Sequence, residues 1–277
     1  MTGVHRHAVF GRPVAHSLSP RIHAAFGAQF GMAIDYRAID AGCEDFPAAL
    51  AAFEQAAGQG ANLTLPLKQA ASTLCVSLAG RARRCGSVNT LLRVAGGWHG
   101  DSTDGAGLVR DLAARHGFSP EGRRVLLLGA GGAARAVAFA LVDADVAHLA
   151  IVNRTHARAA DLAGELGVRA RAVEPADLAV DGGFDLVIHA TAAGHAGAAP
   201  RLGDGLFAPD ALAYDLSYGN AARPFLAAAH AAGASRVSDG LGMLVEQAAE
   251  SFALWHGRWP ATAPVLQASR VALGRAP

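Results

Sequence analysis

The chain has 277 residues, of which 52% are hydrophobic, and a formal net charge of +1. This length suits two modest domains or one large one. The near-neutral charge argues against a protein that binds nucleic acid or a membrane surface. The three cysteines, Cys43, Cys75 and Cys85, form no C-x-x-C pair, so they indicate neither a disulfide framework nor a zinc site.

Neither a secretion signal nor a membrane span is expected. The first seven residues contain no apolar run. The most apolar stretch, 125–142, is interrupted by glycines and an arginine. We therefore expect a soluble, cytoplasmic protein with reduced cysteines and no metal site.

Two serines follow the first predicted strand, which spans residues 8–11. They stand in the segment His16-Ser17-Leu18-Ser19-Pro20, where Pro20 favours a helix start and Ser19 is its expected N-cap. One cap needs one hydroxyl, so capping leaves Ser17 unexplained. Two hydroxyls that flank a leucine are equally suited to hold a small anion such as a carboxylate.

Alternation predicts a second strand over 34–39, and a helix follows over about 45–57. The next segment, 60–68, places Asn62, Thr64 and Lys68 among apolar residues. Lys68 is the only lysine of the chain. Because lysine can exchange its proton and arginine cannot, Lys68 is a candidate general acid or base. A solvated lysine at a helix start is the alternative.

A strand over 88–92 and a hairpin through Gly96-Gly97 lead to two carboxylates. Asp104 suits either a functional acid or the N-cap of a helix over 107–116. Asp101 competes with it for any acidic role.

Residues 124–136 read as a buried strand, a tight glycine turn and an alanine-rich helix. Gly129, Gly131 and Ala134 fit the spacing G-x-G-x-x-[G/A]. In the dinucleotide fingerprint this turn lets a pyrophosphate approach the backbone N–H groups of the helix start. A tight turn without a ligand is the alternative.

The following strand, 148–152, ends at Asn153-Arg154-Thr155, without the acidic residue that usually meets a free ribose 2′-hydroxyl. Arg154 and Arg158 lie four residues apart, on one helical face, so both guanidinium groups can bind a 2′-phosphate. This favours NADP over NAD. An ordinary basic helix start is the alternative, although cations oppose the helix dipole there.

Strands over 184–191 and 212–218 extend the alternation of strands and helices, which predicts a parallel doubly wound sheet. A glycine-, alanine- and proline-rich loop is expected over 192–205. Residues 238–249 lead into a long C-terminal helix that carries Gln247, a polar residue in an apolar setting or simply a surface glutamine.

Together these motifs resemble the shikimate dehydrogenase family over nearly the full chain. The resemblance implies an α/β enzyme with an N-terminal substrate-binding domain, residues 1–104, to which the C-terminal helices, 240–277, return. Residues 105–239 would form a Rossmann NADP-binding domain. The implied reaction is the NADPH-dependent reduction of 3-dehydroshikimate to shikimate on the route to chorismate and the aromatic amino acids. A monomer or homodimer is expected. The residues that carry the match are 16–20, 62–68, 88–90, 103–105, 129–134, 153–155, Arg158 and 239–247.

The resemblance also implies roles for single residues. Ser17 and Ser19 would hold the substrate carboxylate, and Lys68, paired with Asp104, would be the general acid/base. The residues that would bind the ring hydroxyls are Thr64, Asn89, Asp104 and Gln247, with Tyr218 nearby. Those that would bind the cofactor are Gly129, Ala130, Gly131, Gly132, Ala133, Asn153, Arg154, Thr155, Arg158, Thr191, Leu216 and Gly240.

The chain departs from the family pattern at several positions. His189 and Ala192 stand where the family commonly has the asparagine and serine of Asn-Ala-Thr-Ser, which bears on the nicotinamide side of the cofactor site. Ser102 and Gly80 are further departures. Two alternatives stay open: a relative that acts on quinate or an amino-substituted shikimate, and a non-catalytic NADP(H)-binding module.

Overall fold

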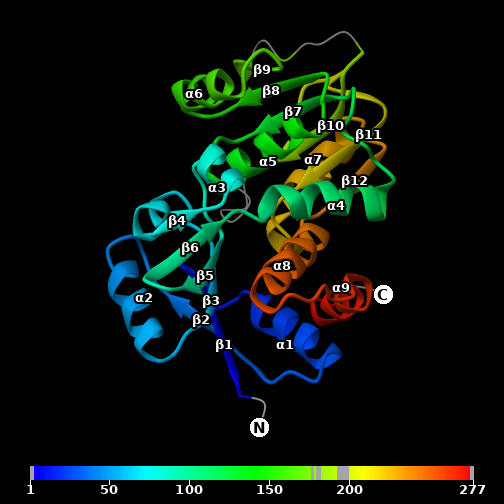
Figure 1. Cartoon of the computed structure of the whole chain (residues 1–277). Helices are drawn as coiled ribbons and strands as arrows, with labels where there is room; N and C mark the ends of the chain where they lie inside the picture. The colour runs from blue at the N-terminus through cyan, green and yellow to red at the C-terminus, as the bar shows by residue number, and fades with distance from the viewer. Residues whose placement is uncertain (1–2, 176–177, 179–181, 192–199, 275–277) are drawn as a thin grey trace. The chain divides into compact units, whose positions relative to one another are not determined.

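The computed structural model describes residues 3–175, 178, 182–191 and 200–274 (Figure 1). The chain forms two compact units. Unit 1 contains residues 1–107 and 244–277, and unit 2 contains residues 108–243. Both boundaries fall inside helices, α4 (Asp104–His116) and α8 (Leu241–His256), whereas the sequence analysis placed them at the starts of these helices.

Unit 1 is built on a mixed sheet with the strand order β2-β1-β3-β5-β6-β4. The central strand β1 pairs in parallel with β2 and β3, while β5 pairs antiparallel with both β3 and β6. The β5–β6 pair is the predicted hairpin through Gly96-Gly97, and both glycines have positive φ. The strands are β1 (His5–Gly11), β2 (Ile34–Asp40), β3 (Gly60–Leu63), β4 (Ser77–Leu78), β5 (Thr90–Val94) and β6 (Gly97–Asp101).

Helices cover both faces of this sheet because successive side chains of a strand point to opposite faces. Phe10 of β1 packs on Phe46 and Phe53 of α2, whereas His7, three residues earlier on the same strand, stacks on Trp255 of α8. The helices of unit 1 besides α8 and the first residues of α4 are α1 (Ser19–Gln29), α2 (Phe46–Gln55), α3 (Gly80–Cys85), α9 (Thr262–Ala272) and the 3-10 helix η1 (Ala70–Leu74).

Unit 2 confirms the predicted doubly wound sheet. All its strand pairs are parallel, in the order β12-β11-β10-β7-β8-β9. From β7 the chain adds β8 and β9 on one side of the sheet, and it then adds β10, β11 and β12 on the other side. The strand order thus reverses between β7 and β10, and open α/β sheets bind ligands at such a point. The elements are β7 (Arg124–Leu128), α5 (Gly132–Asp143), β8 (His148–Val152), α6 (His156–Leu166), β9 (Ala170–Ala172), β10 (Phe184–His189), β11 (Phe207–Asp215), α7 (Arg223–Ala231), β12 (Arg236–Ser238) and the 3-10 helix η4 (Gly219–Ala221).

The central strand β7 is buried on both faces, as a parallel strand between two helical layers must be. Val125 and Leu127 belong to one core cluster, and Leu126 and Leu128 belong to the cluster on the opposite face. The unbroken apolar run that predicted this strand therefore contributes side chains to two hydrophobic core clusters. Among the described helices none is long and apolar enough to cross a membrane.

Candidate active site

The candidate acid–base pair of unit 1 consists of Lys68 and Asp104. Lys68 Nζ lies 2.6 Å from Asp104 Oδ2, and their side chains are only 14% and 5% exposed. The two residues are 36 positions apart: Lys68 follows β3, and Asp104 is the first residue of α4. The shielded ammonium is oriented by a single carboxylate oxygen, so a proton on Nζ is held at a defined place.

Asn89 binds the other carboxylate oxygen of Asp104. Its Nδ2 donates to Asp104 Oδ1 at 2.9 Å and to Thr103 Oγ1 at 2.9 Å, while its Oδ1 accepts the backbone N–H of Thr103 at 2.7 Å. The helix therefore begins at Asp104, three residues before the predicted start, and the two carboxylate oxygens are bonded to side chains. The alternative of Asp104 as a simple helix cap is wrong.

Asp101, the competing carboxylate, has a different partner. Arg81 makes a bidentate contact with it at 2.7 and 2.8 Å, and a further guanidinium nitrogen of Arg81 reaches Glu250 at 2.9 Å. The two carboxylates raise the pKa of Arg81 far above its ordinary value. Since this pair has the planar geometry of a structural ion pair, Asp101 is accounted for without a role in the chemistry.

Thr64 and Lys68 are positioned by a turn at the end of β3. The N–H of Thr64 donates to the Phe10 carbonyl of β1, and the N–H of Leu67 closes the turn on the Thr64 carbonyl at 2.9 Å. The carbonyl of Lys68 then accepts the N–H of Val88 at 2.7 Å, which ties the turn to the segment before β5. The strand ends at Leu63, before Pro66, and the turn places Lys68 beside Asp104.

Ser17 and Ser19 lie together at the start of α1, but the predicted cap is wrong. Ser19 is already helical, because Leu18 adopts α-helical torsions (φ −82°, ψ −8°) at the cap position. Ser17 Oγ accepts the N–H of Ser19 at 3.2 Å and donates to Ser19 Oγ at 3.2 Å. Ser17 thus supplies the local bond, which leaves the buried Ser19 hydroxyl for another partner.

Tyr36 of β2, which the sequence analysis did not single out, belongs to the same unit. Burial raises the pKa of Tyr36 well above its ordinary value. Tyr36 Oη donates to Asn62 Oδ1 at 2.8 Å, and Asn62 Nδ2 donates to Thr90 Oγ1 and to the Asn89 carbonyl. A buried chain of hydrogen bonds therefore runs from Tyr36 to Asn89. The alternation over 34–39 was the only sequence signal for Tyr36.

Gln247 joins the same group from α8. Its Oε1 accepts from Asn89 Nδ2 at 3.1 Å and from Thr103 Oγ1 at 3.3 Å, while its Nε2 donates to the Leu244 carbonyl. A β-carbon at Gly107 would lie 2.7 Å from Gln247 Cβ, so only glycine lets the two helices approach here. Gln247 is buried rather than a surface residue of the helix. Tyr218 belongs to unit 2, directly before η4.

The cofactor residues predicted from the glycine turn lie in unit 2. Gly129 follows β7 with φ +125°, and a β-carbon there would approach the Ala190 carbonyl oxygen to 2.8 Å. Helix α5 starts at Gly132 with no side-chain cap and no acidic residue in its first turn. A β-carbon at Gly131 would meet nothing within 4 Å. This space beside uncapped N–H groups fits the phosphates of a dinucleotide.

The predicted 2′-phosphate site lies at the end of β8. Arg154 and Arg158 are exposed, and their guanidinium groups form no ion pair or hydrogen bond within the described part of the chain. Asn153 Nδ2 donates to the Thr155 carbonyl at 2.9 Å, which shapes the turn before α6. The two cations at a helix start thus have no structural partner among the described residues, which fits a role in holding an anion.

The remaining predicted cofactor residues follow β10, β11 and β12. Thr191 lies against the glycine turn, since a β-carbon at Gly129 would be 3.3 Å from its methyl group. Gly240 packs so tightly on the Leu216 carbonyl that no side chain fits between them. Thr191, Leu216 and Gly240 thus lie beyond the carboxyl ends of β10, β11 and β12, at the edge where open α/β sheets bind ligands. Ala192 lies outside the described residues.

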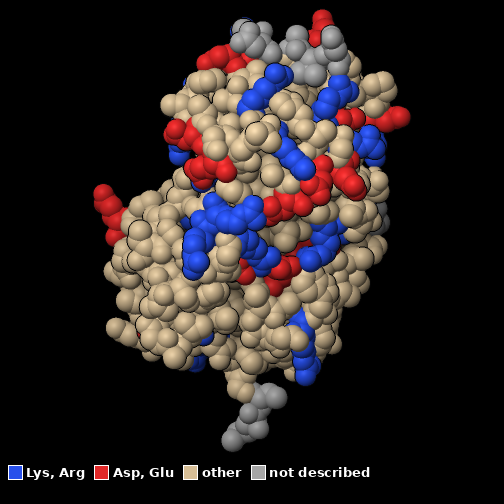
Figure 2. Space-filling model, turned by 45° about the horizontal axis from the view of Figure 1, so that its top comes forward, with Lys and Arg blue, Asp and Glu red and all other residues tan. Residues whose placement is uncertain are grey.

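On the face in Figure 2, basic and acidic side chains adjoin one another, and much of the surface carries neither. Among the described residues no cluster of His, Cys, Asp and Glu has the composition of a metal site.

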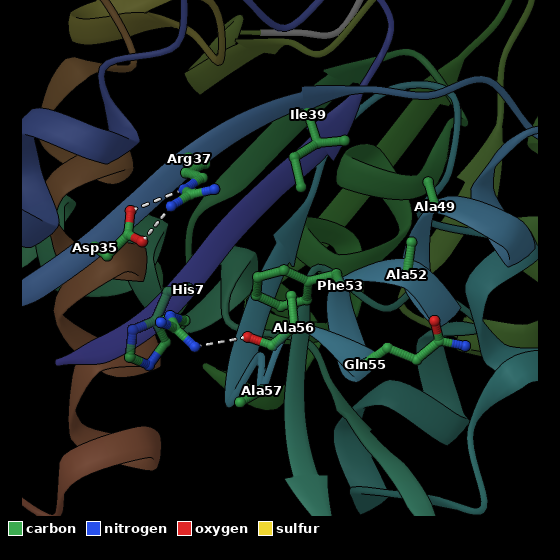
Figure 3. Close-up of a pocket in the computed structure, with 11 residues that line it drawn as sticks. His7, Asp35, Arg37, Ile39, Ala49, Ala52, Phe53, Gln55, Ala56 and Ala57 are labelled. Carbon is green, nitrogen blue, oxygen red and sulfur yellow. Dashed lines mark hydrogen bonds and ion pairs between the residues drawn. The ribbon is translucent and has the colours of Figure 1, made fainter. Parts of the chain in front are cut away.

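An open depression of about 560 Å³ on the α2 face of unit 1 contains none of the predicted site residues (Figure 3). Its charged groups are engaged within the unit: Arg37 pairs with Asp35, and Arg6 donates to the Ala56 carbonyl at 3.0 Å. Its floor is formed by small apolar side chains and Phe53. The depression is therefore separate from the acid–base pair.

Comparison with known proteins finds three family models that match segments of the chain. Residues 9–91 match the shikimate dehydrogenase substrate binding domain, residues 111–198 match shikimate / quinate 5-dehydrogenase, and residues 240–268 match the shikimate 5′-dehydrogenase C-terminal domain. A shikimate dehydrogenase (NADP(+)) of Xanthomonas campestris pv. campestris (strain 8004) is 57% identical over 96% of both chains. One from Xylella fastidiosa (strain M12) is 54% identical over 95% of this chain and 94% of its own.

A solved structure extends the likeness to the fold. Shikimate 5-dehydrogenase from Thermus thermophilus, in complex with NADP(H) and shikimate, superposes with a TM-score of 0.84 at 40% identity. The superposition covers 97% of this chain and 99% of that one.

Proposed function

The chain belongs to the shikimate dehydrogenase family, and we propose that it catalyses the NADPH-dependent reduction of 3-dehydroshikimate to shikimate. The observation that carries the proposal is the shielded pair of Lys68 and Asp104, with Nζ and Oδ2 2.6 Å apart. Reduction of a ketone needs one proton as the hydride arrives, and a single, well-placed amine suffices to deliver it.

Each side chain of the pair has its own part in the reaction. NADPH, when bound, supplies the hydride. Lys68 Nζ holds the proton that the carbonyl oxygen takes up, and it accepts the proton in the reverse direction. Asp104 holds Nζ in place and stabilises its charged form, while Asn89 keeps the carboxylate from turning away.

We assign substrate recognition to the polar groups of unit 1. Ser17 and Ser19 hold the carboxylate, since their hydroxyls lie together at a helix start, where the dipole favours an anion. The donor and acceptor groups assigned to the ring hydroxyls are Thr64, Asn89, Asp104 and Gln247, together with Tyr218 of unit 2.

We assign NADP binding to unit 2. The backbone N–H groups at the start of α5 hold the pyrophosphate, and Arg154 and Arg158 hold the 2′-phosphate. The described residues at the end of β8 include no acidic side chain. The usual partner of an unphosphorylated ribose is therefore missing there. Thr191, Leu216 and Gly240 line the edge that receives the nicotinamide half.

Quinate is the second candidate substrate, because the description of the family matched by residues 111–198 names both shikimate and quinate. Quinate carries an additional hydroxyl on a saturated ring, so the two substrates differ where the ring hydroxyls are recognised. A non-catalytic binding module has no need of the buried Lys68–Asp104 pair. We expect the enzyme to be a cytoplasmic monomer or homodimer, and light scattering of the purified protein tests its oligomeric state.

Isotope transfer tests the proposed reaction. NADPH deuterated at C4 of the nicotinamide, mixed with 3-dehydroshikimate and the enzyme, should give shikimate that has gained one deuterium, measured by mass spectrometry. Formation of no shikimate, with both compounds recovered unchanged, would rule the proposal out.

A further inference from the structure

Next to Asn89, unit 1 contains three buried polar side chains to which the proposed reaction gives no role. They are Asn62 of β3, Thr90 of β5 and Ser251 of α8, and each is at most 5% exposed. Thr90 Oγ1 lies 2.8 Å from Ser251 Oγ and 3.1 Å from Asn89 Oδ1. Because a polar group is costly to bury without a partner, the orientation of each of these side chains depends on the others.

Backbone groups fix the direction of the two amides in this network. The N–H of Thr103 can only donate, and it lies 2.7 Å from Asn89 Oδ1, so Nδ2 is the amide atom that faces Asp104. The carbonyl of Asn89 can only accept, and it lies 3.2 Å from Asn62 Nδ2. The oxygen of Asn62 therefore points the other way, where it accepts from Tyr36 Oη at 2.8 Å. These directions do not depend on the charge of any side chain.

The hydroxyl protons follow from the amides. Asn62 Nδ2 lies 3.1 Å from Thr90 Oγ1 and 3.0 Å from Ser251 Oγ, so both hydroxyl oxygens face an N–H donor. Asn89 Oδ1 carries no proton, and the Thr90 hydroxyl is therefore the donor in their contact. Ser251 then donates to Thr90. The other acceptor near Ser251, the Gln247 carbonyl four residues earlier, already accepts a backbone N–H within α8.

We propose that Thr90 is a positioning residue, whose hydroxyl holds the Asn89 amide with its N–H toward Asp104. Ser251 aligns this hydroxyl. If the amide turned over, its oxygen would face a carboxylate oxygen, and the repulsion would move Asp104 away from Lys68. The effect on catalysis rests on the proposed function, whereas the position of the Lys68 amine is measurable without the reaction.

Three variants separate the hydrogen bond from the filling of space. Thr90→Val keeps the branched shape and removes the hydroxyl, while Thr90→Ser keeps the hydroxyl and removes the methyl group. Ser251→Ala removes the group that aligns the hydroxyl. Thr73→Val is the matched control, because it removes an exposed hydroxyl that is bonded to the Ala70 carbonyl in the same unit.

The amine of Lys68 reports its own position. Lys68 is the only lysine of the chain, so its acylation by acetic anhydride is followed by mass spectrometry of one peptide, with the α-amino group as the internal reference. An amine reacts only when it is neutral and accessible, and the ion pair with Asp104 keeps Nζ charged and shielded. Asp104→Asn removes this ion pair and gives the upper limit of the acylation rate.

Thr90→Val should raise the acylation rate of Lys68 about tenfold, the effect of one lost hydrogen bond. In shikimate oxidation its kcat should fall by a similar factor, with a smaller change of KM. Ser251→Ala should act in the same direction, and the double variant should exceed Thr90→Val by no more than about twofold, since both changes remove the same interaction. Thr90→Ser and Thr73→Val should stay within about twofold of the parent protein.

Other outcomes overturn the inference. An unchanged acylation rate in Thr90→Val would show that its hydroxyl does not hold Asp104 in place, and equal effects of Thr90→Val and Thr90→Ser would make Thr90 a packing residue. If Thr90→Val does not fold, Ser251→Ala decides: parent-like acylation would contradict the inference. A parent protein that does not oxidise shikimate with NADP+ would refute the proposed function, whereas the acylation rates would still decide the role of Thr90.

Discussion

Asp104 is held between two side chains: Lys68 Nζ reaches its Oδ2 at 2.6 Å, and Asn89 Nδ2 reaches its Oδ1 at 2.9 Å. The carboxylate has no rotational freedom left, so the only lysine amine in the chain is kept in one position. In the proposed reaction Asp104 positions the amine and Lys68 exchanges the proton, so substitution can separate the two roles.

Replacement of Lys68 tests proton exchange. Lys68→Ala should lower turnover by roughly 10²–10⁴-fold, the usual contribution of general acid–base catalysis, and change the KM for shikimate little. Lys68→Arg is the matched control, because it keeps the positive charge beside Asp104 but cannot release its proton. Both variants should lose turnover to a similar degree in steady-state assays. An active Lys68→Arg enzyme would mean that charge alone is required.

Replacement of Ser17 tests carboxylate binding. Ser17→Ala should raise the KM for shikimate by about 10-fold, since charge-assisted hydrogen bonds contribute about 1.5–3 kcal/mol, and should change kcat less. Ser72→Ala, which removes an exposed hydroxyl bonded to the Gln69 carbonyl in the same unit, is the control and should leave both constants unchanged. Equal KM values in the two variants would place the carboxylate elsewhere.

Cofactor preference tests Arg154 and Arg158. The double alanine variant should weaken NADP+ binding by at least about 10-fold and leave NAD+ binding nearly unchanged, because only the former carries the 2′-phosphate. Arg169→Ala is the control: its exposed ion pair with Asp145 lies at the amino end of β9, the opposite edge of the sheet. A parallel loss of affinity for both cofactors would contradict the assignment.

Unit 1 should lose stability in mild acid because of buried histidines. Burial, and then repulsion from His256 and His5, lower the pKa of His7 from 6.5 to about 3, and burial lowers the pKa of His256 to about 4. Below pH 6.5 the unfolded chain binds protons that the folded unit does not. Stability is therefore complete above about pH 6.5 and falls toward about pH 4, by about 1.4 kcal/mol per pH unit for His7 and by less for the half-buried His256, whose charge solvent screens.

Urea unfolding at about pH 7.5 and about pH 5.0, on either side of the ordinary histidine pKa, measures this effect. All three tryptophans, Trp98, Trp255 and Trp259, belong to unit 1, so their fluorescence reports on that unit. The variant His7→Phe fills the same space without a proton site and should lose less stability between the two pH values than the parent protein. Parallel losses in the two proteins would show that His7 does not contribute.

Local signals were sufficient for much of the architecture. The apolar run before Gly129 and the glycine spacing predicted a strand, turn and helix, and β7 and α5 have this form. Glycines at 96 and 97 predicted the β5–β6 hairpin, because a tight return needs positive φ there. Such features depend on neighbours in sequence, so a single chain suffices to find them.

The local sequence pattern could not predict contacts between distant segments. The residues around Lys68 do not reveal which carboxylate faces it, and Asp101 and Asp104 were equivalent until Arg81 was found on the former. For Tyr36 the sequence signal was only its position in an alternating strand. Its hydrogen bond to Asn62 exists only because β2 and β3 lie in the same sheet of the folded unit.

The capping prediction failed for a physical reason. A serine directly before a proline is a good N-cap on propensity, but Leu18 already has helical torsions, so the helix starts earlier and Ser17 makes the local bond. Helix ends are set by the backbone of one or two residues, which composition does not determine.

The most direct measurement of the central claim is absorbance at the reduced-nicotinamide band after mixing the protein with shikimate and NADP+. We expect rapid formation of NADPH with this pair, much slower reduction when NAD+ replaces NADP+, and little when quinate replaces shikimate. Comparable rates with quinate would identify a quinate-using relative. No reduction in any mixture, from protein that binds NADP+, would contradict the assignment of a dehydrogenase and leave a binding module.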